Sequence, residues 1–237
     1  ASLNTYAALG LPGAYCEADG THLAWDACPA VMAARFKGKE GYPTIAFNVS
    51  VLHNRKIIFV APWCAGAVND QTQARGDNLF QDMHAGRIHP EIRYALYDEH
   101  GNLQTRHGLY IIVDNGYLQW KCLQAPLKHS LGDAGALWSE RVESVRKAVE
   151  TTFGILKKRF RLLRLPFQST KAEYIDKLFR VCCALHNMLL EYDEFNTVGR
   201  EATDWLPARD VRHRIRTERE RARQEACGAC PALHWGR

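Results

Sequence analysis

Three acidic residues lie in surroundings that suit metal-dependent chemistry. Asp19 stands beside a glycine in the segment Ala-Asp-Gly-Thr-His (18–22), and Asp114 directly follows the apolar run 109–113. A carboxylate at the carboxyl end of a buried strand lies where α/β sheets hold their ligands. Glu150 stands beside an apolar stripe in a long helical pattern, with Gly154 one turn further on the same face. Glycine within a helix costs about 1 kcal/mol relative to alanine, so we expect Gly154 to permit a close approach.

Carboxylates that converge are the ligands Mg²⁺ requires, because this hard ion takes oxygen ligands and is held by one or two carboxylates with substrate phosphates. Two such ions about 4 Å apart activate an attacking water or hydroxyl and stabilise the leaving oxygen of a phosphodiester. Each acid alone also has an ordinary explanation. An Asp-Gly pair is typical of a turn, and Glu150 has Arg146 and Lys147 nearby for a surface ion pair. Spacing alone favours these ordinary explanations.

Three further residues are auxiliary or rival candidates. Asp70 is the main rival acid, but we favour it as the N-terminal cap of a helix. Glu143 lies two turns before Glu150 and lacks the Val-Glu-x-x-Phe-Gly context of residues 149–154, so we prefer Glu150. His22 either orients a carboxylate or phosphate near Asp19 or is an ordinary hydrogen-bonded histidine, two alternatives of about equal weight.

Basic side chains gather around the third acid. Eight bases and three acids occupy the helical pattern 139–164. Lysine and arginine contacts to phosphates supply sequence-independent affinity for DNA. The alternative is a solvated helix face with ordinary ion pairs, but the excess of bases favours DNA. The candidate DNA-binding residues are Arg146, Lys147, Lys157, Lys158, Arg159 and Arg161.

Length and composition exclude several classes of protein. The chain has 237 residues, 46% of them hydrophobic, and a formal charge of +5 that permits a nucleic-acid partner without requiring one. A chain of this size buries roughly three quarters of its unfolded surface, so its core needs no disulfide. No run approaches the roughly 20 apolar residues of a membrane helix, and the first residues lack the pattern of a signal peptide. The eight cysteines therefore indicate reduced intracellular thiols.

The elements that must position these acids follow from the hydrophobic patterning. β-branched and aromatic residues predict strands over 42–52 and 56–63, joined as a hairpin, and a buried central strand over 108–113. Helical periodicity predicts helices over 71–84, 139–164 with Ser139 as N-cap, and 171–192. The segment 14–18 is a less convincing strand. We therefore expect a mixed α/β domain over residues 1–195 and a charged C-terminal tail, helical or disordered, over 196–237.

Five motifs in this order carry a family resemblance. They are Asp-Gly-Thr-His (19–22), Gly-Ala-Val-Asn-Asp (66–70), Val-Asp-Asn-Gly-Tyr (113–117), Arg-x-x-Val-Glu-x-x-Phe-Gly-x-Leu-Lys-x-Arg-Phe (146–160) and Cys-Ala-Leu-His-Asn-Met (183–188). The set resembles the PIF/Harbinger group of DDE-type transposases, and most closely its plant transposon protein branch. The resemblance covers roughly residues 15–195, and the blocks at 146–160 and 183–188 are its most specific parts.

The resemblance implies an RNase H-like fold, a mixed sheet flanked by helices, with Asp19, Asp114 and Glu150 as the catalytic and metal-binding triad. It implies a transposase that uses two Mg²⁺ or Mn²⁺ ions to hydrolyse phosphodiester bonds at transposon ends and to transfer the exposed strand to target DNA. Two alternatives stay open: a domesticated, non-catalytic DNA- or protein-binding derivative, and a nuclease without strand transfer. The resemblance also implies DNA and a Myb-like accessory protein as partners, a homo-oligomer, and action in the nucleus.

Two further motifs concern the C-terminal half and the chain's start. Adjacent to the apolar face of the last helix, His186 and Asn187 indicate a polar packing element without a catalytic role. The spacing Cys227-x-x-Cys230-x-x-x-His234 offers three zinc ligands where a closed site needs four, so free thiols in a tail are the favoured interpretation.

Relatives carry DNA-recognition sequence before the first Asp, and only eighteen residues precede Asp19, so we expect a truncated copy.

Overall fold

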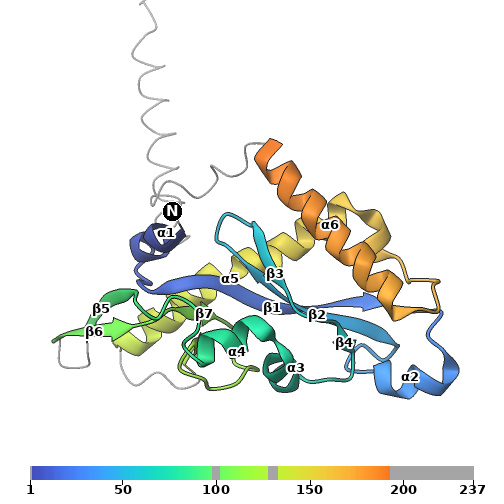
Figure 1. Ribbon diagram of the computed structural model, residues 1–237, viewed down its shortest axis with the longest axis horizontal. Coiled ribbons are helices and arrows are strands. Elements are labelled where there is room, and N and C mark those ends of the chain that lie inside the picture. The colour runs from blue at the N-terminus through green and yellow to red at the C-terminus, as the bar shows by residue number, and fades with distance from the viewer. Residues whose placement is uncertain (1, 98–101, 128–132, 193–237) are drawn as a thin grey trace, which may run out of the picture. The chain divides into compact units, whose positions relative to one another are not determined.

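A mixed β-sheet forms the centre of the computed structural model, which describes residues 2–97, 102–127 and 133–192 (Figure 1). The strands lie in the order β3-β2-β1-β7-β8, with β4 also paired to β2. β1 pairs antiparallel with β2 and parallel with β7, and β7 pairs parallel with β8. These strands are β1 (Ala14–Ala24), β2 (Thr44–Val51), β3 (Ile57–Val60), β4 (Cys64–Ala65), β7 (Tyr110–Ile112) and β8 (Leu123–Gln124).

Helices cover both faces of this sheet (Figure 1). On one face, α5 (Asp133–Arg159) and α6 (Ala172–Tyr192) pack on alternate residues of β1 and β2, such as Leu23 and Phe47. On the other face, α3 (Asp70–Gly76) and α4 (Asn78–His84) pack on Ala18 of β1. Successive residues of a strand point to opposite faces, so β1 serves both cores. Three shorter helices complete the described unit: α1 (Ser2–Ala8), α2 (Ala30–Phe36) and the 3-10 helix η1 (Arg161–Arg164).

The strands and long helices agree with the hydrophobic patterning. The predicted hairpin is formed by β2 and β3, the apolar run 108–113 contains the buried strand β7, and α6 lies within 171–192. The α/β class with a mixed sheet flanked by helices is confirmed. The segment 14–18, whose sequence pattern only weakly predicted a strand, begins β1, an eleven-residue strand. The described residues belong to a compact unit that spans Ala1–Arg200.

Three local predictions were wrong. The pattern 71–84 is two helices, because Asp77 ends α3 and its carboxylate accepts a hydrogen bond from the N–H of Phe80 as N-cap of α4. Ser139 is not an N-cap, since α5 begins at Asp133 and the Ser139 hydroxyl donates to the Gly135 carbonyl. The hairpin of β5 (Arg93–Tyr97) and β6 (Leu103–His107) was missed, because β6 is exposed throughout and shows no apolar alternation.

No helix in the described ranges is both long and apolar enough to cross a membrane. The predicted tail over 196–237, with Cys227, Cys230 and His234, lies outside the described residues.

His186 and Asn187 fix α6 against the edge of the sheet, as their apolar surroundings predicted. The Asn187 side chain accepts a hydrogen bond from the N–H of Ile57 at 2.9 Å and donates to the carbonyl of the same residue at 2.7 Å. His186 is fully buried and its Nε2 donates to the Arg55 carbonyl at 3.0 Å. Asn187 therefore satisfies both backbone groups of Ile57 at edge strand β3.

We expect Asn187→Leu to lower the free energy of unfolding by about 2 kcal/mol, because it leaves both backbone groups of Ile57 without their partner. Urea denaturation of the full chain measures the change. The control is Glu173→Gln, an exposed position on the same helix, for which we expect less than about 0.5 kcal/mol. A loss for Asn187→Leu no larger than that of the control would contradict this role.

Candidate active site

The parallel pairing of β1 with β7 brings the first two acids together. Glu17 of β1 is paired with Ile112 of β7, so two residues further along each strand Asp19 and Asp114 stand side by side. Neighbouring strands lie about 4.8 Å apart. Asp114 lies two residues beyond Ile112, the last residue of β7, so it stands at the carboxyl end of a buried strand as its position after an apolar run predicted. Each carboxylate accepts a short backbone hydrogen bond of 2.7 Å, Asp19 from the N–H of Gly20 and Asp114 from that of Gly116.

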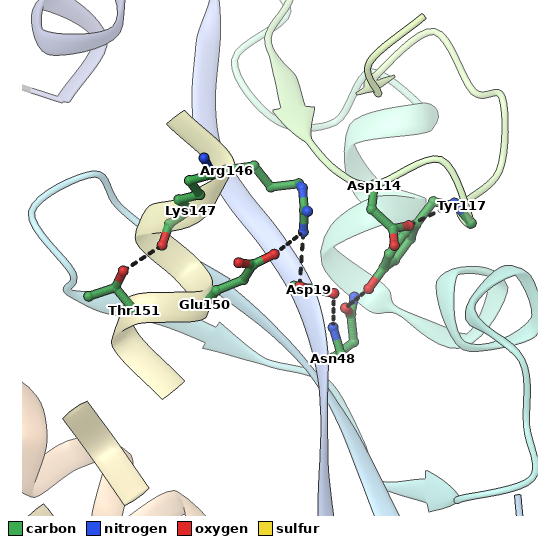
Figure 2. Close-up of polar contacts among 10 residues, drawn as sticks. Asp19, Asn48, Asp114, Tyr117, Arg146, Lys147, Glu150 and Thr151 are labelled. Atoms are coloured by element: carbon green, nitrogen blue, oxygen red, sulfur yellow. Dashed lines mark hydrogen bonds and ion pairs between the residues drawn. The ribbon is translucent and has the colours of Figure 1, made fainter. Parts of the chain in front are cut away.

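Helix α5 brings Glu150 to the same place through an arginine. The Arg146 Nη1 lies 3.2 Å from Asp19 Oδ2 and 2.8 Å from Glu150 Oε1, one helical turn away (Figure 2). Because both oxygens contact the same nitrogen, they are at most about 6 Å apart. Asp19 and Arg146 are about four-fifths buried, whereas Glu150 is half exposed. The guanidinium therefore occupies the space between two of the three predicted acids.

Burial and neighbouring charges perturb the carboxyl group of Asp19. Burial raises its pKa to about 6, against the favourable effects of the Gly20 N–H and the Arg146 guanidinium. The negative charges of Asp114 and Glu150 raise the pKa of Asp19 further. The three acids are thus electrostatically coupled. Such a coupled, largely buried carboxyl group in a polar cluster is typical of functional sites.

Asp70 also belongs to this cluster, contrary to its interpretation as a helix cap. The N-cap of α3 is Asn69, whose side chain accepts from the N–H of Thr72, and Asp70 is the first helical residue. A methyl group built on Gly116 would lie 3.0 Å from both Asp70 Oδ2 and Asp114 Oδ1. The two carboxylate oxygens are therefore within about 6 Å of each other. Any side chain at position 116 would intrude between them.

A buried chain of hydrogen bonds joins Tyr117, Asn48 and Asp77 next to the acid cluster. The Tyr117 hydroxyl donates to Asn48 Oδ1 at 2.7 Å (Figure 2), and Asn48 Nδ2 donates to Asp77 Oδ2 at 2.7 Å. Asp77 in turn caps α4. The pKa of Tyr117 is raised by burial and then by the charges of Asp19 and three other aspartates, Asp70, Asp114 and Asp77. Tyr117 is therefore a fixed neutral donor at the base of the cluster.

Asn48, Asp77 and the role of Tyr117 were not foreseen from the sequence. Asn48 stands in an otherwise apolar strand, and Asp77 precedes Phe80 at the spacing of a cap, so both left a local signal. Their mutual contact joins residues 29 positions apart, which no local pattern reveals.

The remaining site candidates lie nearby but in other surroundings. His22 donates or accepts a hydrogen bond with Thr44 Oγ1 at 2.9 Å, and its pKa is lowered by burial and by Lys39, while Asp70 acts in the opposite sense. Glu143 is exposed two turns from Glu150. Gly154 makes no close approach: a methyl group built there meets no atom within 4 Å, so the expectation of tight packing was wrong. The surface beside Glu150 is open at that point.

The candidate DNA-binding bases divide into two groups. Arg146 is held between the acids, and Lys157 is half-buried and donates to the His22 carbonyl at 3.1 Å. Arg159 is also partly buried. The exposed members of the set are Lys147, Lys158 and Arg161. The basic surface beside Glu150 is therefore narrower than the residue count predicted.

The cluster suits a divalent cation by its charge and donor atoms. The cluster holds four acids, Asp19, Asp70, Asp114 and Glu150, and one guanidinium that contacts two of them, which leaves an excess of negative charge in a partly buried place. Carboxylate oxygens are the ligands of Mg²⁺ and Mn²⁺. The Arg146 guanidinium already supplies one positive charge between the carboxylates of Asp19 and Glu150. Within the described ranges, however, no three histidine, cysteine, aspartate or glutamate side chains converge as metal ligands do.

The raised pKa of Asp19 predicts a pH-dependent stability. The folded chain holds the Asp19 proton up to about pH 6, whereas an unfolded aspartate releases it near pH 3.9. A raised carboxyl pKa favours folding at low pH, so its contribution is lost as the pH rises from about 4 to 6. We expect the wild type to lose about 2 to 3 kcal/mol relative to Asp19→Asn between pH 4 and pH 7.

Denaturation of both chains in EDTA across this pH range measures that difference. Asp26→Asn, at an exposed position, is the control and should track the wild type at every pH. A wild type and Asp19→Asn that differ by a constant amount across the range would show that Asp19 is not perturbed.

Comparison with known proteins agrees with the arrangement of these motifs. No curated protein and no solved structure matches the chain. A family of plant transposon proteins matches residues 2–197, a range that includes the sheet, the acid cluster and α6. Because the match covers most of the 237 residues, the chain belongs to the plant transposon protein family.

Proposed function

We propose that the chain is a DDE-type transposase nuclease that cleaves phosphodiester bonds at transposon ends and joins the exposed 3′-hydroxyl to target DNA. The observation that carries the proposal is the meeting of Asp19 and Asp114 on parallel strands with Glu150 across the Arg146 guanidinium. Membership of a transposon protein family supports the same activity. Asp70, which lies beside Asp114, is an auxiliary acid of this site.

Asp19, Asp114 and Glu150 would hold Mg²⁺ or Mn²⁺, two ions in all. Bound there, the ions supply an activated water or DNA hydroxyl and stabilise the leaving oxygen of the phosphodiester. The neutralisation of the acids also matters for substrate binding, because an uncompensated cluster of carboxylates repels the phosphates of DNA. Tyr117, the tyrosine at the base of the cluster, is buried and donates its hydroxyl to Asn48, so we expect no covalent protein–DNA intermediate.

The chain's own residues orient and restrain the acids. The Gly20 N–H fixes one oxygen of Asp19, and the Gly116 N–H fixes one oxygen of Asp114. The second oxygen of Asp19 contacts Arg146, so a ligand reaches it when the arginine is displaced. The hydrogen bond between the neutral side chains of Tyr117 and Asn48 fixes the residues at the base of the cluster. Arg146, when displaced by a metal, becomes free to contact a DNA phosphate together with the exposed Lys147 and Lys158.

A non-catalytic derivative is the second candidate, and one observation favours it. Arg146 neutralises Asp19 and Glu150 without any metal, as expected of a scaffold that has become purely structural. The two candidates differ in whether a divalent metal displaces the guanidinium. In either case we propose DNA as the main partner, a Myb-like accessory protein as the source of sequence recognition, and the nucleus as the place of action.

We expect Asp114→Asn and Glu150→Gln each to reduce Mn²⁺-dependent nicking of supercoiled plasmid by at least about 1,000-fold, because each removes a negative charge that the ions require. Glu143→Gln is the matched control on the same helix and should keep nearly full activity. Asp70→Asn should fall between these limits. Nicking that survives both Asp114→Asn and Glu150→Gln would contradict the assignment, and a wild type inactive with either metal would favour the non-catalytic candidate.

Joining of a labelled 3′-hydroxyl end to a second DNA separates a transposase from a simple nuclease.

The position of Arg146 predicts a metal affinity that rises when the arginine is removed. We expect Arg146→Gln to bind Mn²⁺ about 3- to 10-fold more tightly than the wild type, because a positive charge within hydrogen-bond distance of two carboxylates no longer competes with the ion. Isothermal titration calorimetry and the Mn²⁺ electron paramagnetic resonance signal measure this affinity without reference to catalysis. Lys147→Gln, the neighbouring exposed base, is the control and should change the affinity by less than about 2-fold.

Weaker Mn²⁺ binding by Arg146→Gln would show that the arginine holds the acids in place for the metal and does not compete with it.

A further inference from the structure

Helix α6 is apolar on two sides. Its inner side is buried against β2, β3 and α5 through residues that include Ile175, Phe179 and Cys182. An amphipathic helix on the surface of a domain normally presents polar residues on the side away from the core. Here the outer side carries apolar residues instead, and Figure 1 shows α6 at the periphery of the described unit.

The outer apolar residues are strongly exposed among the described residues. The exposed fraction is 57% for Tyr174, 53% for Val181, 66% for Met188 and 85% for Tyr192. Leu185 is also exposed, and Leu178 is half-buried. Single exposed apolar residues are ordinary on protein surfaces, but a contiguous row of them marks an interaction site.

The spacing of this row is that of a coiled-coil seam. Starting from Tyr174, the intervals alternate between four and three residues over the whole helix. This is the pattern of the a and d positions of a heptad, which face a partner helix. The a positions are Leu178, Leu185 and Tyr192, and the d positions are Tyr174, Val181 and Met188. The partner that such a seam fits is therefore another apolar helix.

The row is complementary to itself when a second copy runs antiparallel. In that arrangement each a residue meets a d residue of the other helix, and the sequence forms complete layers: Leu185 with Val181, Leu178 with Met188, and Tyr192 with Tyr174. All six side chains find an apolar counterpart, and the two-fold axis passes near Ala184. A self-complementary surface of this kind is what a two-fold symmetric dimer requires.

The charges beside the row agree with the same register. The g positions are Lys177, Ala184 and Glu191. In an antiparallel pair, g positions face each other, so Lys177 meets Glu191 of the second copy twice and the small Ala184 meets itself at the centre. Glu191 now pairs with Lys56 at 2.9 Å on the exposed surface, an interaction weak enough to be shared or exchanged. A parallel pair would bring neither charge opposite its complement.

We propose that the outer face of α6, defined by Tyr174, Leu178, Val181, Leu185, Met188 and Tyr192, pairs with the same face of a second copy to form an antiparallel, two-fold symmetric homodimer. The inference does not depend on the nuclease activity. A helix pair of this length buries an area near the lower limit of specific interfaces, about 1,000 Å² in total, so we expect a dissociation constant in the micromolar range.

The first test is the oligomeric state of the full chain, measured by sedimentation velocity from about 1 to 100 μM. We expect a reversible dimer. Met188→Glu places a charge in each of the two layers that pair Leu178 with Met188 and should weaken the dimer at least about 100-fold. Leu137→Glu is the matched control, because Leu137 is a leucine of α5 that is similarly exposed and lies outside the α6 row. This control should leave the dimer unchanged.

The second test is a charge exchange that reports the direction of the helices. Lys177→Glu and Glu191→Lys should each weaken the dimer about 3- to 10-fold, because like charges then meet at two symmetric places. The double variant, Lys177→Glu with Glu191→Lys, should restore the wild-type dissociation constant. Single variants without effect, or a double variant as weak as the worse single, would overturn the antiparallel register.

Two results would overturn the proposal as a whole. One is a wild type that stays monomeric up to 100 μM, and the other is a dimer that Met188→Glu leaves intact. In the monomeric case, the reactivity of a Met188→Cys variant toward a maleimide identifies the occupant. A shielded thiol would assign the face to another part of this chain, and a reactive thiol would leave it open to a different protein.

Discussion

The parallel alignment of β1 with β7 is the constraint on which the site depends. It fixes two aspartates side by side at the end of a short buried strand, in a place where one of them is about four-fifths buried. Carboxylates so arranged repel each other and have lost much of their hydration, so the fold must supply positive charge or donors close by. Two backbone N–H groups and one arginine of α5 meet that need. Helix α5, which packs on the sheet through Val149 and Leu156, thereby also carries Glu150 to the site.

The same cluster explains the polar residues within the sheet. Asn48, Asp77 and Tyr117 form a buried hydrogen-bonded network that ties β2, the start of α4 and the loop after β7 to one another. Each member satisfies the next, so none is costly to bury. The network also holds the site rigid from beneath, while the side facing Glu150 and Gly154 stays open.

Local patterns in the sequence predicted the elements with a regular apolar pattern. They failed for elements whose polar residues have partners far away in the chain. Apolar alternation and helical periodicity correctly predicted β2, β3, β7 and α6. They undervalued β1, because Glu17, Asp19 and Thr21 interrupt its apolar pattern. Glu17 accepts a hydrogen bond from the buried Tyr6, and Asp19 pairs with Arg146, so these two acids find their partners only in the folded chain. The boundary between α3 and α4 at Asp77 was missed for a similar reason, because Asn48 of the distant strand β2 donates a hydrogen bond to the Asp77 carboxylate.

At the candidate site, local motifs predicted the acids but not the contacts between them. Asp114 was predicted from its place after a buried strand, and Glu150 from its helix and its motif. Arg146 was expected to bind DNA because it stands among bases, yet it contacts Asp19, 127 positions earlier in the chain. Asp70 was predicted to be the cap of α3, but the neighbouring Asn69 provides that cap. Charge counting and local motifs cannot reveal such pairings, which exist only once the sheet and helices are assembled.

The most direct test of the account is the anomalous scattering of Mn²⁺ in crystals of the full chain. We predict anomalous density in contact with the carboxylates of Asp19, Asp114 and Glu150, with the Arg146 side chain turned away from its position between Asp19 and Glu150. Saturating Mn²⁺ that leaves no density at this cluster, with Arg146 still bound to both acids, would contradict a metal-dependent active site.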